Sequence, residues 1–172
     1  MSLHAVALAF GLLAGGVDPT PSGDAPLSET EKSFIDAIAA TDRAQIELSK
    51  AVAMRSAQPA VRKLARRIAD EDTANYHDLF AIALAKHYAV APQLDERHRD
   101  ALDRVRHART RKALEHAYLD ALMLDQTNAA EMLQRIADDG KDAHLAQYAR
   151  DTLQLVRKQQ HAVHEIAGDQ RG

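Results

Sequence analysis

Four segments of the chain place apolar residues at alternating intervals of three and four, the spacing that brings them onto one face of an α-helix. Polar residues interrupt each stripe near its middle. The pattern predicts four long helices that share one core. The stripes are Phe34, Ile38, Thr41, Gln45, Leu48 and Val52; Val61, Leu64, Ile68, Asp72, Asn75, Leu79 and Ile82; Leu114, Tyr118, Ala121, Asp125, Asn128, Met132 and Ile136; and Leu145, Ala149, Thr152, Val156, Gln159 and Val163.

Residues with strong end preferences mark the limits of the first two helices. Ser28 and Glu31 have the Ser-x-x-Glu spacing of a capping box, so the first helix is expected to begin there. It should end near Ser56, because Pro59 disfavours a helical residue before it and suits the first turn of the second helix. The second helix should stop before Pro92. The short link between the two predicts antiparallel neighbours.

The remaining signals predict a crossover and two more long helices. Residues 94–109 are strongly charged with few apolar anchors, and we interpret them as a short helix within a long connection. A third long helix is expected from about Thr110 to Gly140, and a fourth from a cap at Asp142 to a stop at Gly168. Two short links separated by a long one are typical of ferritin-like bundles. The sequence therefore predicts an all-α, ferritin-like four-helix bundle with a short extra helix in the crossover.

The composition agrees with one all-α domain and excludes several kinds of binding and catalytic site. The chain has 172 residues, of which 46% are hydrophobic and only 4% aromatic, whereas strand proteins are richer in aromatic and β-branched residues. The formal net charge is -3, so no whole-chain attraction to nucleic acid is expected. There is no Cys, which excludes disulfides, thiolate metal ligands and a cysteine nucleophile.

The N-terminal region has the pattern of an export signal. Residues 5–14 form an uninterrupted apolar run before Gly15 and Gly16, similar to the core of a signal peptide, although no basic residue precedes it. The run is shorter than the roughly 20 residues of a membrane span, and the alternative is an apolar tail without a targeting role. We expect a leader over 1–16, a linker over 17–27, the bundle over 28–168 and a tail over 169–172. The mature chain should then be periplasmic or envelope-associated, with no transmembrane span.

The polar interruptions of the four stripes lie at similar heights, so antiparallel packing should bring them into one layer. Buried polar groups are costly unless they are paired or bind something. Two interpretations stay open. The layer is either a hydrogen-bonded network or a metal site charged by Asp72 and Asp125, because amides are weak ligands. Its members are Gln45, Asp72, Asn75, Asp125, Gln126 and Gln159.

Several short segments resemble the ferritin-like domain of unknown function 4142, a family of predicted exported or outer-membrane proteins of bacteria. They are residues 42–48 (DRAQIEL), 70–73 (DEDT) and 117–121 (AYLDA) with Asp125 and Gln126 after it, and Thr152 and Leu153 before Gln159. The resemblance covers about residues 31–166. It implies the fold and an exported location, but no defined activity.

The chain departs from the family at the positions that the resemblance would assign to metal ligands. Where the family has Glu, this chain has Gln45, and where it has His, this chain has Asp72, Gln126 and Gln159. Each replacement keeps a hydrogen-bonding group of modest size. We therefore interpret the layer as a vestigial metal site and expect no cofactor; a transition metal held by Asp72 and Asp125 is the alternative.

Two other features are weaker candidates for binding. His161 and His164 lie one turn apart and could chelate a surface metal, but no third ligand is obvious. The other His of the predicted helices, His98 among them, are expected on solvated faces. A basic segment could dock on an anionic envelope polymer or lipid, although acids nearby also allow a salt-bridged face. Its residues are Arg104, Arg106, Arg109, Arg111 and Lys112.

Recognisable catalytic motifs are absent from the sequence. No Gly loop that could cradle a phosphate and no Gly-x-Ser-x-Gly elbow occurs. We predict no catalytic residues and expect a non-enzymatic, exported envelope protein with a structural or interaction role. The alternative is a metal-binding or metal-dependent redox protein of the ferritin-like class.

Overall fold

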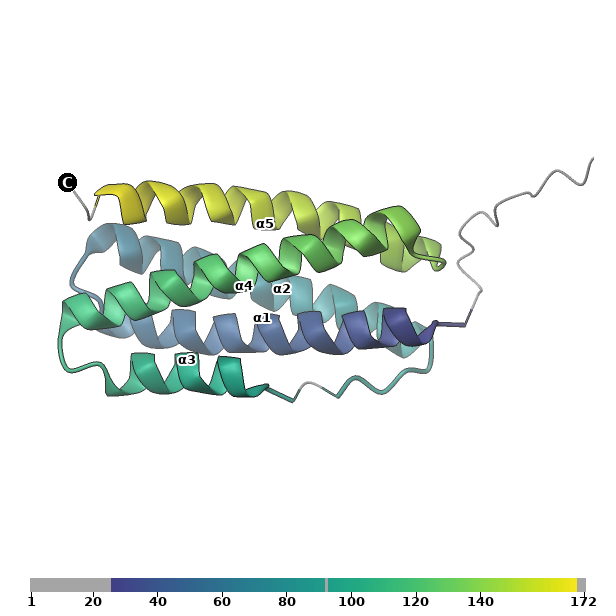
Figure 1. The fold of residues 1–172 in the computed structure, drawn as a ribbon, viewed down its shortest axis with the longest axis horizontal. Helices are drawn as coiled ribbons and strands as arrows, with labels where there is room; N and C mark the ends of the chain where they lie inside the picture. The colour runs from purple at the N-terminus through teal and green to yellow at the C-terminus, as the bar shows by residue number, and fades with distance from the viewer. Residues whose placement is uncertain (1–25, 92, 170–172) are drawn as a thin grey trace, which may run out of the picture.

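Five helices make up the part of the chain that the computed structural model describes, residues 26–91 and 93–169 (Figure 1). No strand occurs in this part, so the all-α prediction is confirmed. The predicted leader, most of the predicted linker and the last three residues of the predicted tail lie outside it. The helices are α1 (Glu29–Arg55), α2 (Pro59–Ala85), α3 (Glu96–His107), α4 (Arg111–Asp139) and α5 (Ala143–Asp169).

The four long helices form a bundle whose connectivity is the predicted one. Short links join α1 to α2 and α4 to α5, and the members of each pair run antiparallel (Figure 1). The connection from α2 to α4 returns along the outside of the bundle, so α2 and α4 run in the same direction. The short helix α3 lies in this crossover and packs against α1 and α4.

Side-chain caps define the helix ends as the sequence indicates. Ser28 and Glu31 form a complete capping box, in which the Ser28 N–H donates to Glu31 Oε2 at 2.8 Å. Thr110 Oγ1 accepts the N–H of Ala113 at the start of α4. Asp142 Oδ1 accepts the N–H of Leu145 at the start of α5, at 2.9 Å. These bonds satisfy backbone donors that helix geometry leaves unpaired.

The end of α5 differs from the prediction. Gly168 was expected to stop this helix, but it lies inside α5, which ends one residue later at Asp169. Gly168 is exposed and a Cβ at this position would meet nothing within 4 Å. Its surroundings impose no left-handed turn, so the helix continues through it.

The hydrophobic core consists of two clusters, one at each end of the bundle. One is built around Leu48, Val52, Leu64, Ile68, Leu114 and Leu122 and includes the apolar face of α3. The other is built around Phe34, Ile38, Leu79, Leu133, Leu145 and Leu153. Burying each of these side chains stabilises the fold by about 1.5–3 kcal/mol. The polar residues of the four stripes separate the two clusters.

Candidate functional site: the buried polar layer

All six residues predicted for the polar layer are buried in the described structure. Their side chains nevertheless belong to more than one hydrogen-bonded group. Gln45 is buried on α1, and the other five take part in three separate networks. The exposed fractions are 3% for Gln45, 4% for Asp72, 7% for Asn75, 3% for Asp125, 0% for Gln126 and 2% for Gln159.

The first network joins α2, α4 and α5 through Gln159. Its Nε2 donates to Asp72 Oδ1 and to Glu71 Oε2, both at 3.0 Å. Gln126 Nε2 donates to Gln159 Oε1 at 3.4 Å. Burial raises the pKa of Asp72 from 3.8 to about 7; the Gln159 hydrogen bond opposes this rise and the charge of Glu71 adds to it. Asp72 Oδ2 and Gln126 Oε1 are buried without a hydrogen-bond partner among the described residues.

The second network joins α1, α2 and α5 through Asn75. Its Nδ2 donates to Asp42 Oδ2 at 2.8 Å, and its Oδ1 accepts from Thr152 Oγ1 at 2.7 Å. Burial raises the pKa of Asp42 well above its usual range, and the nearby charge of Asp72 raises it further. Asp42 was not predicted as a member of the layer. Asp42 follows Thr41 at the edge of the apolar stripe. The sequence does not show whether a residue at this edge is buried, because that depends on how α1 and α2 pack.

The third network joins α4 to the crossover helix. Arg97 Nη1 contacts Asp125 Oδ1, and His98 Nε2 lies 3.7 Å from the same oxygen. His98 Nδ1 lies 2.9 Å from Asp95 Oδ1 without the geometry of a hydrogen bond. Burial raises the pKa of Asp125, and the positive charge of Arg97 opposes that rise. Burial lowers the pKa of His98, and the charge of Asp125 opposes the fall.

The position of His98 corrects the expectation of a solvated face. The side chain is only 2% exposed, because α3 packs through Ala101, Leu102 and Val105 into a core cluster. That packing turns the first turn of α3, with Arg97 and His98, toward α4. This segment has too few apolar residues for its sequence to indicate which side chains face inward.

The two carboxylates of the metal hypothesis therefore have different partners. Asp72 interacts with Gln159 and lies near Asp42 and Glu71, whereas Asp125 faces Arg97 and His98. No group of three or more His, Asp or Glu able to hold a metal ion occurs in residues 26–91 and 93–169. The residues present do not match the pair of Glu and pair of Glu-x-x-His motifs of di-metal bundles.

Two buried carboxylates outside the layer organise the helix links. Glu31 Oε1 accepts the N–H groups of Lys141 and Asp142 at 2.9 and 2.8 Å, tying the start of α1 to the α4–α5 link. Glu115 Oε1 accepts from Ser56 Oγ, and from the N–H groups of Ala57 and Gln58, in the α1–α2 link. Their role is structural, since each satisfies backbone donors at a turn. The Ser-x-x-Glu spacing predicted the cap at Glu31 but not its second set of bonds, and no pattern in the sequence indicated the role of Glu115.

The two weaker candidates lie at the surface. His161 Nε2 lies 3.3 Å from Glu165, and His164 Nδ1 is bonded to the carbonyl oxygen of Gln160 at 2.7 Å. In the basic segment, Arg106 lies 3.3 Å from Glu47, so part of its charge is paired. All five basic residues are exposed, and the other four form no ion pair with a described residue: Arg104, Arg109, Arg111 and Lys112.

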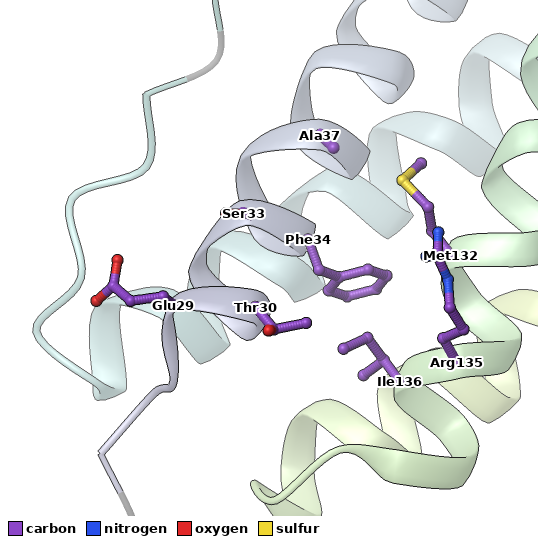
Figure 2. Close-up of a pocket in the computed structure, with 8 residues that line it drawn as sticks. All are labelled: Glu29, Thr30, Ser33, Phe34, Ala37, Met132, Arg135 and Ile136. Atoms are coloured by element: carbon purple, nitrogen blue, oxygen red, sulfur yellow. The ribbon is translucent and has the colours of Figure 1, made fainter.

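An apolar hollow of about 520 Å³ lies between α1 and α4. Figure 2 shows the side chains of Phe34 and Ile136 facing one another across it, with Met132 and Arg135 on the α4 side and Glu29 turned away. None of the residues of the three polar networks lines it. The hollow therefore offers shape and apolar surface but no convergent chemistry.

The family model of the domain of unknown function DUF4142 matches residues 17–166. This chain belongs to the DUF4142 family. The crystal structure of a DUF305 fragment from Deinococcus radiodurans is similar in fold, with a TM-score of 0.76 over 84% of this chain and 99% of that chain. The sequences are 16% identical, so the likeness of this DUF4142 chain to the fragment concerns the fold alone. No match was found among curated proteins.

Proposed function

We propose that this DUF4142 chain is a non-enzymatic bundle protein, exported to the bacterial envelope, that acts through structural or binding contacts. The main support is the distribution of its buried carboxylates. Asp42, Asp72 and Asp125 each have a different set of protein partners, on different helices. A catalytic or redox centre needs such groups to converge on one reacting atom or ion. Here they hold helices together.

Metal content is the measurement that tests this proposal against the metal-dependent alternative. That alternative draws support from Asp72 Oδ2 and Asp125 Oδ2, which are buried without hydrogen-bond partners. Elemental analysis of protein purified without chelators should give no stoichiometric iron, manganese or copper. Stoichiometric metal that is lost in Asp72→Ala, together with a metal-dependent rise in melting temperature, would instead establish the alternative.

The basic segment is the surface that we propose for contact with an anionic envelope component. Arg104, Arg109, Arg111 and Lys112 are exposed and unpaired among the described residues. Binding of the full chain to vesicles containing phosphatidylglycerol should weaken steeply with salt, since screened surface charges would carry it. Replacing Arg109, Arg111 and Lys112 by Glu should abolish it. Replacing Arg135, Lys141 and Lys158 by Glu changes the net charge equally and should weaken vesicle binding much less. Equal losses of binding in the two variants would show that net charge, and not the basic segment, determines binding.

Export is tested separately from activity. None of the described helices is long and apolar enough to span a membrane, and the apolar run of residues 5–14 lies outside the described residues. A fusion of the full chain to a reporter enzyme that is active only outside the cytoplasm should be active. Deleting residues 1–16 should abolish that activity, and retained activity would contradict a leader.

A further inference from the structure

One end of the bundle, on the left of Figure 1, concentrates positive charge. At this end α1 is linked to α2, and α3 is linked to α4. No Asp or Glu occurs in residues 54–69 or in residues 104–114, which form these links and the helical turns beside them. The next acid, Glu115, is 3% exposed and is bonded to the α1–α2 link. The last turns of α5 also reach this end, and their Glu165 lies 3.3 Å from His161.

Hydrogen bonds join the two links into one surface. Arg55, the last residue of α1, donates through Nη2 to the carbonyl oxygen of Ala108 at 3.2 Å. From α4, Glu115 Oε1 accepts the N–H groups of Ala57 and Gln58 at 3.0 and 3.2 Å. The α1–α2 link is therefore bonded both to the α3–α4 link and to the start of α4. The backbone positions that carry the charges of this end are fixed relative to one another.

Two cations of α2 extend the basic segment. Lys63 and Arg66 are exposed and form no ion pair with another described residue. The same holds for Arg111 and Lys112 of α4. Because α2 and α4 both begin at this end, and helical side chains lean toward the N-terminus of their helix, these four cations lean toward the end of the bundle. We call this surface the basic end; its cations without an ion-pair partner in the described structure are Lys63, Arg66, Arg104, Arg109, Arg111 and Lys112.

The basic end also exposes apolar groups. Met54, in the last turn of α1, is 80% exposed, the largest exposed fraction of any large hydrophobic side chain in the described structure. Ala57, Pro59 and Ala60 are exposed beside it in the α1–α2 link and the first turn of α2. A soluble polyanion would use only the charges, whereas a bilayer offers phosphate groups to the cations and an apolar boundary to these side chains. The combination therefore favours a lipid surface.

We propose that the basic end docks on a bilayer of anionic phospholipids, with the long helices upright on the surface. This inference rests on the envelope contact proposed above, to which it adds the partner, the orientation of the bundle and the contribution of α2. Lys63 and Arg66 contact lipid phosphates together with the basic segment, and Met54 lies at the apolar boundary. Each basic residue close to an anionic leaflet strengthens binding about fivefold, so the two cations of α2 contribute measurably.

Cosedimentation of the full chain with vesicles of phosphatidylglycerol and phosphatidylcholine tests the contribution of α2. Replacing Lys63 and Arg66 by Glu should weaken binding about 10- to 100-fold. Replacing Arg135 and Lys141 by Glu makes the same charge change at the opposite end of the bundle and should weaken binding less than about threefold. Equal losses in the two variants, with circular dichroism showing both chains folded, would assign the binding to net charge and overturn the basic end.

Fluorescent labels on single cysteines measure the orientation, since the chain has no Cys of its own. The labels are placed at exposed positions, with Ala57→Cys at the basic end, Glu96→Cys at the start of α3 and Asp139→Cys at the opposite end. Lipids that carry a nitroxide on the headgroup should quench the label at residue 57 most strongly and the label at residue 139 least. Quenching at residue 96 or 139 as strong as at residue 57 would overturn the upright orientation and leave the proposed envelope contact intact.

Met54→Ser distinguishes a bilayer from a soluble polyanion. The variant should bind the vesicles about fivefold more weakly, because an apolar contact is lost, and should bind linear polyphosphate as wild type does. Leu84→Ser is the matched control, since Leu84 is 67% exposed near the opposite end of the bundle, and it should bind both as wild type does. Polyphosphate binding as tight as vesicle binding, with no effect of Met54→Ser, would overturn the bilayer as partner. The absence of any vesicle binding by wild type would contradict the envelope contact itself.

Discussion

Asn75 on α2 donates a hydrogen bond to the carboxylate of Asp42 on α1, at 2.8 Å in the buried middle of the bundle. The same amide accepts from Thr152 on α5 at 2.7 Å. One side chain thus connects three helices where the hydrophobic core is interrupted. An amide that is bonded through both its nitrogen and its oxygen in such a position specifies how the helices align, because any shift in register leaves buried polar atoms unpaired.

Asn75→Ala should reduce the free energy of unfolding by about 2–4 kcal/mol, because it leaves the Asp42 carboxylate and the Thr152 hydroxyl without their partner. Urea unfolding measures the change. Asn128→Ala is the control, since Asn128 lies half-buried on α4 and is not part of these networks; it should cost less than about 1 kcal/mol. Similar losses in both variants would show that the network contributes little.

The contribution of Asp72 to the stability of the protein should fall as pH rises from about 4 to about 7. The pKa of Asp72 is raised from 3.8 to about 7 and that of Asp42 is raised as well, mainly by burial. In this window the native state keeps protons that the unfolded state has released, so each unit of pH favours unfolding. Above about pH 7 the contribution of Asp72 is constant. A shift of this size corresponds to at most about 4 kcal/mol.

Comparison of wild type with Asp72→Asn isolates this effect. Other groups have the opposite slope, because their pKa values are lowered in the folded state. Burial alone would raise the pKa of Glu31, but its hydrogen bonds from Ser28 and from the Lys141 and Asp142 N–H groups outweigh that effect. At Asp95 the hydrogen bond from the His98 N–H and the neighbouring positive charges together outweigh burial. The contributions of Glu31 and Asp95 are the same in both proteins, so they cancel when the unfolding free energy of wild type is subtracted from that of the variant. The variant should gain stability relative to wild type by about 1–4 kcal/mol between pH 4 and pH 8. Asp70 is an exposed neighbour, so the difference in unfolding free energy between Asp70→Asn and wild type should not change with pH. A difference that is equally independent of pH for Asp72→Asn would contradict the argument that burial raises the pKa of Asp72.

Glu115 should be essential to the α1–α2 link through a single oxygen. Its Oε1 accepts three hydrogen bonds, from the Ser56 hydroxyl and from the N–H groups of Ala57 and Gln58. Glu115→Ala leaves these donors without an acceptor and should destabilise the fold by about 2–4 kcal/mol. Glu115→Gln retains an acceptor and should cost about half as much or less. Thermal unfolding measures both, and equal losses would mean that packing rather than hydrogen bonding explains the effect.

Much of the fold could be predicted from the sequence because its signals are local. The capping box at Ser28, the proline at residue 59 and the cap at Asp142 each act within one helical turn. The apolar stripes then require the helices to pack, and the link lengths select the connectivity. Gly168 was the exception among the predicted ends, since a glycine without a close neighbour permits a stop but does not impose one.

The polar layer was harder to predict, because the packing of the helices determines which of its side chains bond to one another. Periodicity identified Asp72 and Gln159, and Gln126 was predicted as the neighbour of the stripe residue Asp125; the structure joins Asp72, Gln126 and Gln159. Periodicity could not show that Asp125 would face a charged crossover helix rather than the same network. Nor could it indicate Asp42, whose burial depends on the neighbouring helices. Residues on the flank of a stripe become interior or exposed only once the rotation of each helix is fixed.

The contact between Arg97 and Asp125 should hold α3 on the bundle. Arg97→Ala would leave the Asp125 carboxylate buried without its cation. Breaking a fully buried pair typically costs about 3–5 kcal/mol, and we expect a smaller loss here because the Arg97 side chain is 34% exposed. Because α3 is short and lies in the crossover, we expect the effect as faster amide hydrogen exchange in residues 96–107, with the four long helices less affected. Arg104→Ala is the matched control on the same helix, since Arg104 is exposed and pairs with no described residue. Unchanged exchange in the Arg97 variant would show that the apolar face of α3 suffices to hold it, and that the partly buried ion pair only compensates its own desolvation.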